Sequence, residues 1–323
     1  VRNRGEANDA PYYSSPDPSV GHDYSNRTYT GWSPRLAAFW NLTPDVAFFA
    51  SWNRTWRAPV IDEQYEVQGP NSSRSATSLN LNPERITAIT AGNVTNFSGL
   101  FTRDDNLQLR TTLFHNRIED EIMKATGLGC AQQMTVPGSI ATVCTDAASK
   151  TNYRNVGGMT IKGFELESYY DSTYVFGSLS YSWATGKRDN PYTNPWATDR
   201  HVWARDIPPA KWVAVLGTKI PSWDAQVGWQ GQFVRKTDRV PTDVYAGGLN
   251  SSIGDFIYDQ TENPSYDTQG LFANWKPQQA GLKGTEVNFT VDNLFNRSYQ
   301  PALSGEGVYS EGRNAKISIT RYF

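Results

Sequence analysis

Apolar and polar residues alternate along much of this chain. Near the C-terminus, Ala315, Ile317 and Ile319 alternate with polar or charged side chains, and Val287 and Phe289 do so slightly earlier in the sequence. A period of two is typical of β-strands with one apolar face. No stretch of about 18 consecutive apolar residues occurs, so the sequence predicts strands and not transmembrane helices.

The alternation predicts about eleven strands, and the connections between them are alternately short turns and long loops. The predicted strands cover residues 27–42, 46–57, 84–95, 106–120, 153–170, 173–187, 209–220, 223–238, 265–276, 285–297 and 313–323. Short turns on the periplasmic side and long loops outside are typical of outer-membrane barrels. The loops expected outside the cell are residues 1–26, 58–83, 121–152, 188–208, 239–264 and 298–312.

The polar face of the predicted strands indicates the class of barrel. It carries Gln, Ser, Asn, Lys and Glu side chains, whereas a soluble barrel of this size would fill its interior with apolar ones. We therefore predict an all-β fold, an antiparallel transmembrane β-barrel with lipid outside and a polar lumen inside. A soluble β-sandwich is the alternative, but several alternations exceed about ten residues, which is long for its strands.

The strand count predicts that the chain is part of a larger barrel. Single-chain bacterial barrels have even numbers of strands, and about eleven is half of the roughly 22 found in plugged outer-membrane transporters. Residues 1–323 are therefore expected to form the C-terminal portion of one barrel domain, without its plug. On its free side, the last strand should pair with a first strand that this chain does not contain.

Composition and charge narrow the function. Aromatic residues make up 13% of the chain, including 11 Trp and 17 Tyr, and membrane barrels place such residues in girdles at both interfaces. A net charge of −2 provides no basic field for nucleic acid. The two cysteines, Cys130 and Cys144, lie in a polar stretch and could form a disulfide or remain free thiols. A disulfide would indicate an oxidising compartment such as the periplasm or cell surface.

Three segments resemble TonB-dependent outer-membrane receptors. VDNLFNRSYQP at 291–301 is similar to the penultimate strand of that family, RNVGGMTIKGFELES at 154–168 to an internal strand, and GRNAKISITRYF at 312–323 to the terminal strand with its closing aromatic residue. The resemblance implies a location in the bacterial outer membrane, in contact with its lipid. It also implies loops that capture cargo, and a plug on which the inner-membrane TonB complex pulls.

Two boxes resemble those of haem and haemoglobin receptors within this family. TWRAP at 55–59 is similar to their FRAP box, with Trp56 in place of Phe, and LNLNPER at 79–85 to their NPNLKPE box, although Ser78 and Leu79 replace the leading Asn-Pro. This resemblance implies that the cargo is haem, taken from haemoglobin or from a secreted haemophore. Ferric-siderophore receptors carry similar boxes, so siderophore import is the alternative. A passive porin or surface-binding barrel is the alternative from another class.

The candidate iron ligands are Tyr65 and His201. The subgroup usually has a His between the two boxes, but this chain has none there, and Tyr65 is the strongest ligand in that loop. A tyrosinate binds ferric haem well, and the alternative is an exposed or girdle tyrosine. His201 lies in a predicted loop between Trp196 and Trp203, whose rings could stack on a porphyrin, and it could equally face water or a partner protein.

Several arginines could pair with haem propionates, because guanidinium groups suit carboxylates. They are Arg54, Arg57, Arg200 and Arg205. For Arg57, the favoured interpretation is a role in setting the start of the long loop beside Pro59. The remaining histidines are His22, in the first loop segment, and His115, which is expected to be structural.

No sequence motif indicates catalysis. HExxH, GxSxG and CxxC are absent, and the histidines have no convincing catalytic partner in the sequence. We therefore predict a receptor that is not an enzyme, with haem as transported cargo and no other cofactor.

Overall fold

The computed structural model consists mainly of β-strands. The described residues are 1–3, 26–65, 77–124, 130–136, 139–144, 153–155, 157–189, 201–204, 207–237, 263–304 and 307–322. Within these ranges, no helix has the length and apolar character needed to cross a membrane.

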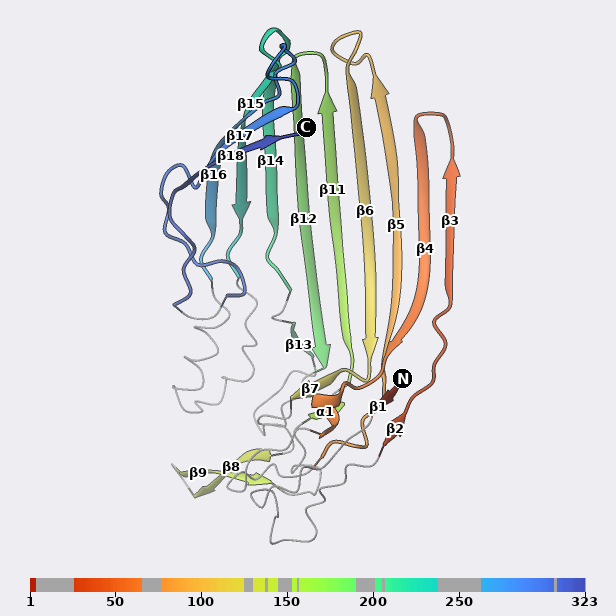
Figure 1. Ribbon diagram of the computed structural model, residues 1–323. Coiled ribbons are helices and arrows are strands. Elements are labelled where there is room, and N and C mark those ends of the chain that lie inside the picture. Colours follow the sequence, from red (N-terminus) through yellow and green to blue (C-terminus); the bar gives the residue numbers. More distant parts are fainter. Residues whose placement is uncertain are drawn as a thin grey trace.

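Eleven long strands form one antiparallel sheet, in which neighbours follow the chain order (Figure 1). They are β3 (Arg35–Asn41), β4 (Val46–Arg57), β5 (Glu84–Ser98), β6 (Asn106–Glu119), β11 (Met159–Asp171), β12 (Val175–Asp189), β14 (Lys211–Ile220), β15 (Ala225–Val234), β16 (Tyr266–Trp275), β17 (Thr285–Asp292) and β18 (Asn314–Arg321). Each predicted strand range overlaps one of these strands, and the predicted all-β antiparallel fold is confirmed. Within the described residues the sheet is open, with β3 and β18 at its edges.

Shorter elements gather at the end of the sheet where β4, β6 and β12 finish, which we call the loop end (Figure 1). They are β1 (Arg2–Asn3), β2 (Arg27–Thr28), α1 (Ile61–Tyr65), β7 (Ile122–Lys124), β8 (Cys130–Val136), β9 (Ser139–Cys144), β10 (Tyr153–Asn155) and β13 (His201–Trp203). Short turns join the strands at the opposite end, the turn end, where the 3-10 helix η3 (Pro221–Trp223) connects β14 to β15.

Asp105 closes the turn between β5 and β6. Its carboxylate accepts hydrogen bonds from the backbone N–H groups of Leu100, Phe101 and Thr102, at 2.7, 2.7 and 2.8 Å. Burial acts to raise the pKa of this carboxyl, but the N–H donors outweigh burial and the pKa falls below its usual value. An ionised carboxylate therefore satisfies three donors that have no ladder partner in this turn.

The cross-strand register gives the sheet one continuous apolar face. Leu113 lies opposite Phe164, which lies opposite Trp183, and residues directly opposite one another point to the same side. At the β18 edge, Ile317 and Ile319 of the same face are each 68% exposed. An apolar face this open suits hydrocarbon, because exposing it to water costs about 25 cal/mol per Å².

The opposite, polar face carries paired charges and hydrogen-bonded side chains. Arg110 lies 3.7 Å from Glu167 across β6 and β11, and Lys316 lies 3.4 Å from Asp292 across β17 and β18. Gln230 on β15 donates to Asp292 at 3.1 Å, so the network extends over several strands. Such a face suits a polar lumen, as the sequence predicts.

Phenylalanine rings on the polar face lie over glycines of the neighbouring strand. The directly opposite pairs are Phe49 and Gly92, Phe114 and Gly163, Phe176 and Gly217, and Phe272 and Gly228. A Cβ added at each of these glycines would meet the ring. Glycine weakens a strand because it has no side chain to pack, and an aromatic ring on the next strand replaces that contact.

The strand predicted for 285–297 ends early, at Asp292. Asn293 follows with a positive φ of 48°. Its side chain donates to the carbonyl of Arg297 and accepts the N–H of the same residue, both at 2.8 Å. The alternation of apolar and polar residues does not reveal this turn. The turn forms because the Asn293 side chain hydrogen-bonds to nearby backbone groups, which competes with the hydrogen bonds between strands.

Gly92→Val should destabilise the wall, whereas Ala91→Val on the exposed apolar face of the same strand should not. A Cβ at Gly92 would lie 2.5 Å from Cζ of Phe49 and closer still to the backbone carbonyl of Thr111. We expect Gly92→Val to lower the free energy of unfolding of the full-length protein by about 1–3 kcal/mol, measured by urea titration in lipid vesicles. Equal stability of the two variants would contradict the packing role of the Phe49 and Gly92 pair.

Candidate functional site

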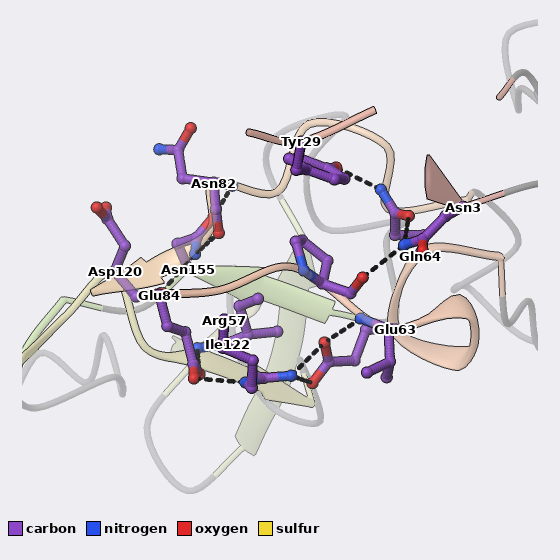
Figure 2. A network of polar contacts seen from close by, with 12 residues as sticks. Asn3, Tyr29, Arg57, Glu63, Gln64, Asn82, Glu84, Asp120, Ile122 and Asn155 are labelled. Carbon is purple, nitrogen blue, oxygen red and sulfur yellow. Dashed lines mark hydrogen bonds and ion pairs between the residues drawn. The ribbon is translucent and has the colours of Figure 1, made fainter. Parts of the chain in front are cut away.

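The two boxes recognised in the sequence are the two ends of one connection at the loop end. Arg57, the last residue of β4, lies directly opposite Glu84, the first residue of β5. Its Nε donates to Glu84 Oε2 at 2.6 Å, and its Nη1 donates to both carboxylate oxygens of Glu63 in α1 at 2.9 Å (Figure 2). We call Arg57, Glu63 and Glu84 the arginine clamp, because they hold both ends of the connection to its first helix.

Both carboxylates of the arginine clamp also accept backbone N–H groups. Glu63 Oε2 accepts from Val60 at 2.9 Å, and Glu84 Oε1 accepts from Ile122 in β7 at 2.7 Å. These carboxylate side chains are only 14% and 11% exposed, and buried charges need such partners. The hydrogen bond with Glu84 outweighs burial and raises the pKa of the Arg57 guanidinium above its usual value, so it stays charged.

Amide hydrogen bonds hold α1 against the first residues of the chain. Asn3 Nδ2 donates to Gln64 Oε1 and to the backbone carbonyl of Pro59, both at 2.5 Å, and Gln64 Nε2 donates to the Tyr29 hydroxyl at 2.5 Å (Figure 2). Asn3 and Gln64 are buried. Burial raises the pKa of the Tyr29 hydroxyl. Residues far apart in the sequence therefore fix the start of this loop.

Asn155 connects the next loop to the same place. It accepts the N–H of Asn82 at 2.8 Å and donates to the carbonyls of Asn82 and Asp120, at 3.0 and 2.6 Å (Figure 2). Asn82 and the buried Leu81 belong to the LNLNPER box at 79–85. This box therefore builds the common base of two loops.

Tyr65 lies inside this base. It is the last residue of α1 and is 8% exposed, and its hydroxyl donates to the backbone carbonyl of Asn3 at 3.5 Å. Ligation of haem iron would require the hydroxyl to leave that position. A ligand role for Tyr65 stays a prediction.

The partners of Arg57 were not predicted from the sequence. An arginine at one end of a loop and an acidic residue at the other is a usable signal for a closing ion pair, and Glu84 stands in a recognised box. No sequence signal pointed to Glu63 or to Asn3. The observed contacts give Arg57 a structural role, and its pairing with a haem propionate stays a prediction.

His201 and Trp203 lie elsewhere, on the short strand β13 beside β12. In the ladder, His201 is opposite Asp189 and Trp203 is opposite Lys187. His201 Nδ1 lies 3.0 Å from Asp189 Oδ1, and Lys187 Nζ lies 4.7 Å from the centre of the Trp203 ring. Lys187 and Asp189 lie four and six residues after Trp183 on β12. Side chains at even spacing in a strand face the same side, so both lie on the apolar-face side of the sheet.

The Asp189 carboxylate can orient the His201 imidazole. A carboxylate that accepts one ring N–H leaves the other ring nitrogen available to a metal. Asp189 Oδ2 is itself held by the N–H of Gly158 at 2.8 Å, and the His201 side chain is 62% exposed. The part of the chain that the structure describes has no group of three or more His, Cys, Asp or Glu placed around a metal ion. Haem iron can take a single protein ligand, so His201 stays a candidate.

The other candidates divide into two groups. Arg54 lies 3.8 Å from Glu119, and His115 lies opposite Lys162 on the apolar-face side. Outside the described residues are His22, Trp196, Arg200, Arg205 and the terminal Phe323.

Cys130 and Cys144 are directly opposite each other in the hairpin of β8 and β9. Opposite residues of antiparallel strands have Cα atoms about 4.5–5.5 Å apart, which a disulfide can span. The backbone arrangement therefore permits the bond, and the disulfide itself stays a prediction.

Comparison with known proteins decides the family. The family described as TonB dependent receptor-like, beta-barrel matches residues 5–294. The chain belongs to the TonB-dependent receptors. Membership places this receptor chain in the bacterial outer membrane, as the sequence predicts.

Relatives of the receptor chain align with all of it. It is 42% identical to TonB-dependent heme receptor A of Haemophilus ducreyi and 41% identical to the protein of that name from Haemophilus influenzae. The alignments cover 100% of this chain but only 42% and 41% of the two relatives. The chain thus spans less than half the length of these relatives.

Solved receptor structures share the fold. The FrpB iron transporter from Neisseria meningitidis has a TM-score of 0.64 and 17% identity, over 94% of this chain and 41% of that one. A double mutant of the Serratia marcescens hemophore receptor HasR, in complex with its hemophore HasA and heme, has a TM-score of 0.61 and 16% identity, over 100% of this chain and 46% of that one. At these identities the likeness shows the fold alone.

Arg57→Gln should loosen the base of the loops in the full-length receptor. Glu63 and Glu84 would lose the cation between them, and leaving such largely buried carboxylates without it costs about 1–3 kcal/mol. We expect the backbone amides of Val60 and Ile122 to exchange hydrogen for deuterium roughly tenfold faster, measured by mass spectrometry or NMR.

The matched control is Arg54→Gln, because Arg54 is 45% exposed and lies 3.8 Å from its partner. This change should leave the exchange of both amides unchanged. Unaltered protection in Arg57→Gln would show that the arginine clamp does not hold the loops.

The cysteine pair predicts a redox-dependent labelling pattern. In receptor isolated without reductant, iodoacetamide should modify neither Cys130 nor Cys144, and after reduction it should modify both, as read by peptide mass spectrometry. Cys130→Ser should make Cys144 reactive without reduction. Labelling of both cysteines in the unreduced receptor would exclude the disulfide.

Proposed function

We propose that the receptor containing this chain imports haem across the outer membrane, taking it from haemoglobin or a haemophore. The observation that carries this proposal is the 40–42% identity, over the whole chain, to proteins named TonB-dependent heme receptor A. The names of more distant relatives, heme/hemopexin utilization protein C and hemin receptor, also specify haem. Haem is the transported cargo in this proposal and not a resident cofactor.

The two faces of the sheet suit this role. The apolar face lies against lipid, the polar face lines the lumen, and the loop end lies outside the cell. External loops capture the cargo, and the arginine clamp keeps the base of those loops in place. A plug outside this chain closes the lumen, and the TonB complex of the inner membrane supplies energy through that plug.

His201 and Tyr65 are the proposed iron ligands. His201 has an exposed ring oriented by Asp189, and Trp203 beside it is 39% exposed and could stack on the porphyrin. Because His201 points to the apolar-face side, it would act in capture outside the barrel and not within the lumen. Tyr65 lies in the loop between the two boxes, and Arg57 next to that loop could meet a propionate only by releasing a carboxylate partner.

The alternative functions have less support. Siderophore import would use the same barrel, but the names of the relatives at 40–42% identity specify haem. Membership of the TonB-dependent receptors argues against a passive porin. Membership of this receptor family also gives no support to an enzymatic function.

Haem titration of the full-length receptor tests the proposal. We expect a saturable shift of the Soret band and no competition from a ferric catecholate. His201→Ala should change the Soret position if His201 is the ligand, and Asp189→Asn should weaken binding by about 10–100-fold. Tyr65→Phe should change the Soret position if Tyr65 is the ligand.

His115→Ala and Tyr309→Phe are the matched controls, since both residues are exposed and are not proposed ligands. Both should titrate like the wild type. A receptor that binds the ferric catecholate and produces no Soret shift with haem would favour siderophore import instead.

A further inference from the structure

We propose that basic residues on the apolar-face side of the loop end bind the phosphate groups of the outer-leaflet glycolipid, the lipid A part of lipopolysaccharide. The residues, which we call the basic rim, are Arg54, Arg85, Arg117, Lys162 and Lys187. This lipid site goes beyond cargo import. It rests on the placement of the loop end outside the cell.

The register places the basic rim on one side of the sheet. A single row of directly opposite residues crosses β4, β5, β6, β11 and β12 and consists of Arg54, Thr87, Arg117, Thr160 and Lys187. Arg85 and Lys162 flank this row, two residues away along β5 and β11 from Thr87 and Thr160. All five basic residues are exposed. Five neighbouring strands thus each present one basic group on the same side of the sheet.

The basic rim borders the apolar face at the loop end. Arg54 comes two residues after Trp52 on β4, and Lys162 comes two residues before Phe164 on β11. Two residues along a strand span about 7 Å. With the apolar face in hydrocarbon, the charged groups therefore lie at the depth of the lipid headgroups.

Positive charge exceeds negative charge on this surface. Besides the five basic residues, the same side of these strands carries Glu119 and Asp189, together with His115. Glu119 is shared by the two arginines of the row, at 3.8 and 3.3 Å, and Asp189 faces His201. Among the described residues, Arg85 and Lys162 take part in none of the ion pairs. An anionic ligand would balance this excess of positive charge.

The turn end of the same side has a different character. There, the directly opposite residues Phe97, Leu107 and Tyr170 cross β5, β6 and β11. Within β4 to β12, the basic side chains on the apolar-face side therefore lie at the loop end. This asymmetry fits a ligand of the outer leaflet and does not fit a phospholipid headgroup common to both leaflets.

A cavity of about 600 Å³ lies at the loop end, beside β12, β14 and β15. Its lining includes Tyr181 and Trp183, which share the side of Lys187, together with Arg235 and Lys236. Aromatic rings can contact a sugar while cations meet its phosphate. Trp183 lies four residues before Lys187 on β12, so the cavity supplies a place for a phosphorylated sugar at the same end of the sheet as the basic rim.

Binding of purified lipid A with two phosphate groups to the full-length receptor, in neutral detergent, tests the proposal. We expect saturable binding by the wild type. The variant Arg85→Gln/Lys162→Gln/Lys187→Gln should bind roughly a hundredfold more weakly, because each basic residue near an anionic surface contributes about a fivefold factor. The matched variant Lys219→Gln/Lys276→Gln/Lys283→Gln removes the same charge at the turn end and should bind like the wild type.

Two further probes separate the sources of phosphate. Lipid A stripped of phosphate should bind the wild type at least tenfold more weakly, and phosphatidylglycerol in the same detergent should also bind more weakly than lipid A. Equal binding of lipid A with and without phosphate, or equal binding by the wild type and the rim variant, would overturn the proposal. The comparison of lipids on the wild type holds even if the rim variant fails to fold. The assay contains no haem, so its outcome is independent of the proposed import function.

Discussion

The backbone hydrogen-bond ladder between strands is the interaction on which the rest of this structure depends. Within hydrocarbon no water is available to an N–H or C=O group, so each strand of the wall must satisfy both of its edges on neighbouring strands. The ladder fixes the register, and the register fixes which side each residue faces. A shift by one residue would place Ser182 in lipid and Trp183 in the lumen. The glycines covered by phenylalanine rings add packing to this ladder without changing its register.

At the loop end, side-chain hydrogen bonds take over from the ladder. Arg57 and Glu84 form the last pair of β4 and β5, and beyond them the carboxylates accept the N–H groups of Val60, just before α1, and of Ile122 in β7. Asn155 and Asn3 serve further backbone groups in the same way. A buried polar base of this kind holds loops in place without an apolar core, which a wall one sheet thick cannot provide.

Polarity changes in two directions across this protein. Across the sheet, apolar and polar faces separate lipid from lumen. Along the strands, the side chains on the apolar-face side change from apolar to basic over two residues, as from Trp52 to Arg54 on β4. The first change suits a barrel in the outer membrane, and the second suits its outer leaflet, where the phosphate groups of lipid A are found. The same ladder produces both, because it aligns like residues of successive strands in rows.

The sequence by itself determined the strands, their faces and the family. Period-two alternation is a local property, so it placed β4 at Val46–Arg57 and the other long strands near their observed positions. Local pattern could not show that β17 ends at Asp292, because that depends on the side chain of Asn293. Only the tertiary structure decided the partners of Arg57, the burial of Tyr65 and the side on which His201 lies. These depend on which strands are neighbours and on their register, and they bring Asn3 into contact with Gln64 across many intervening residues.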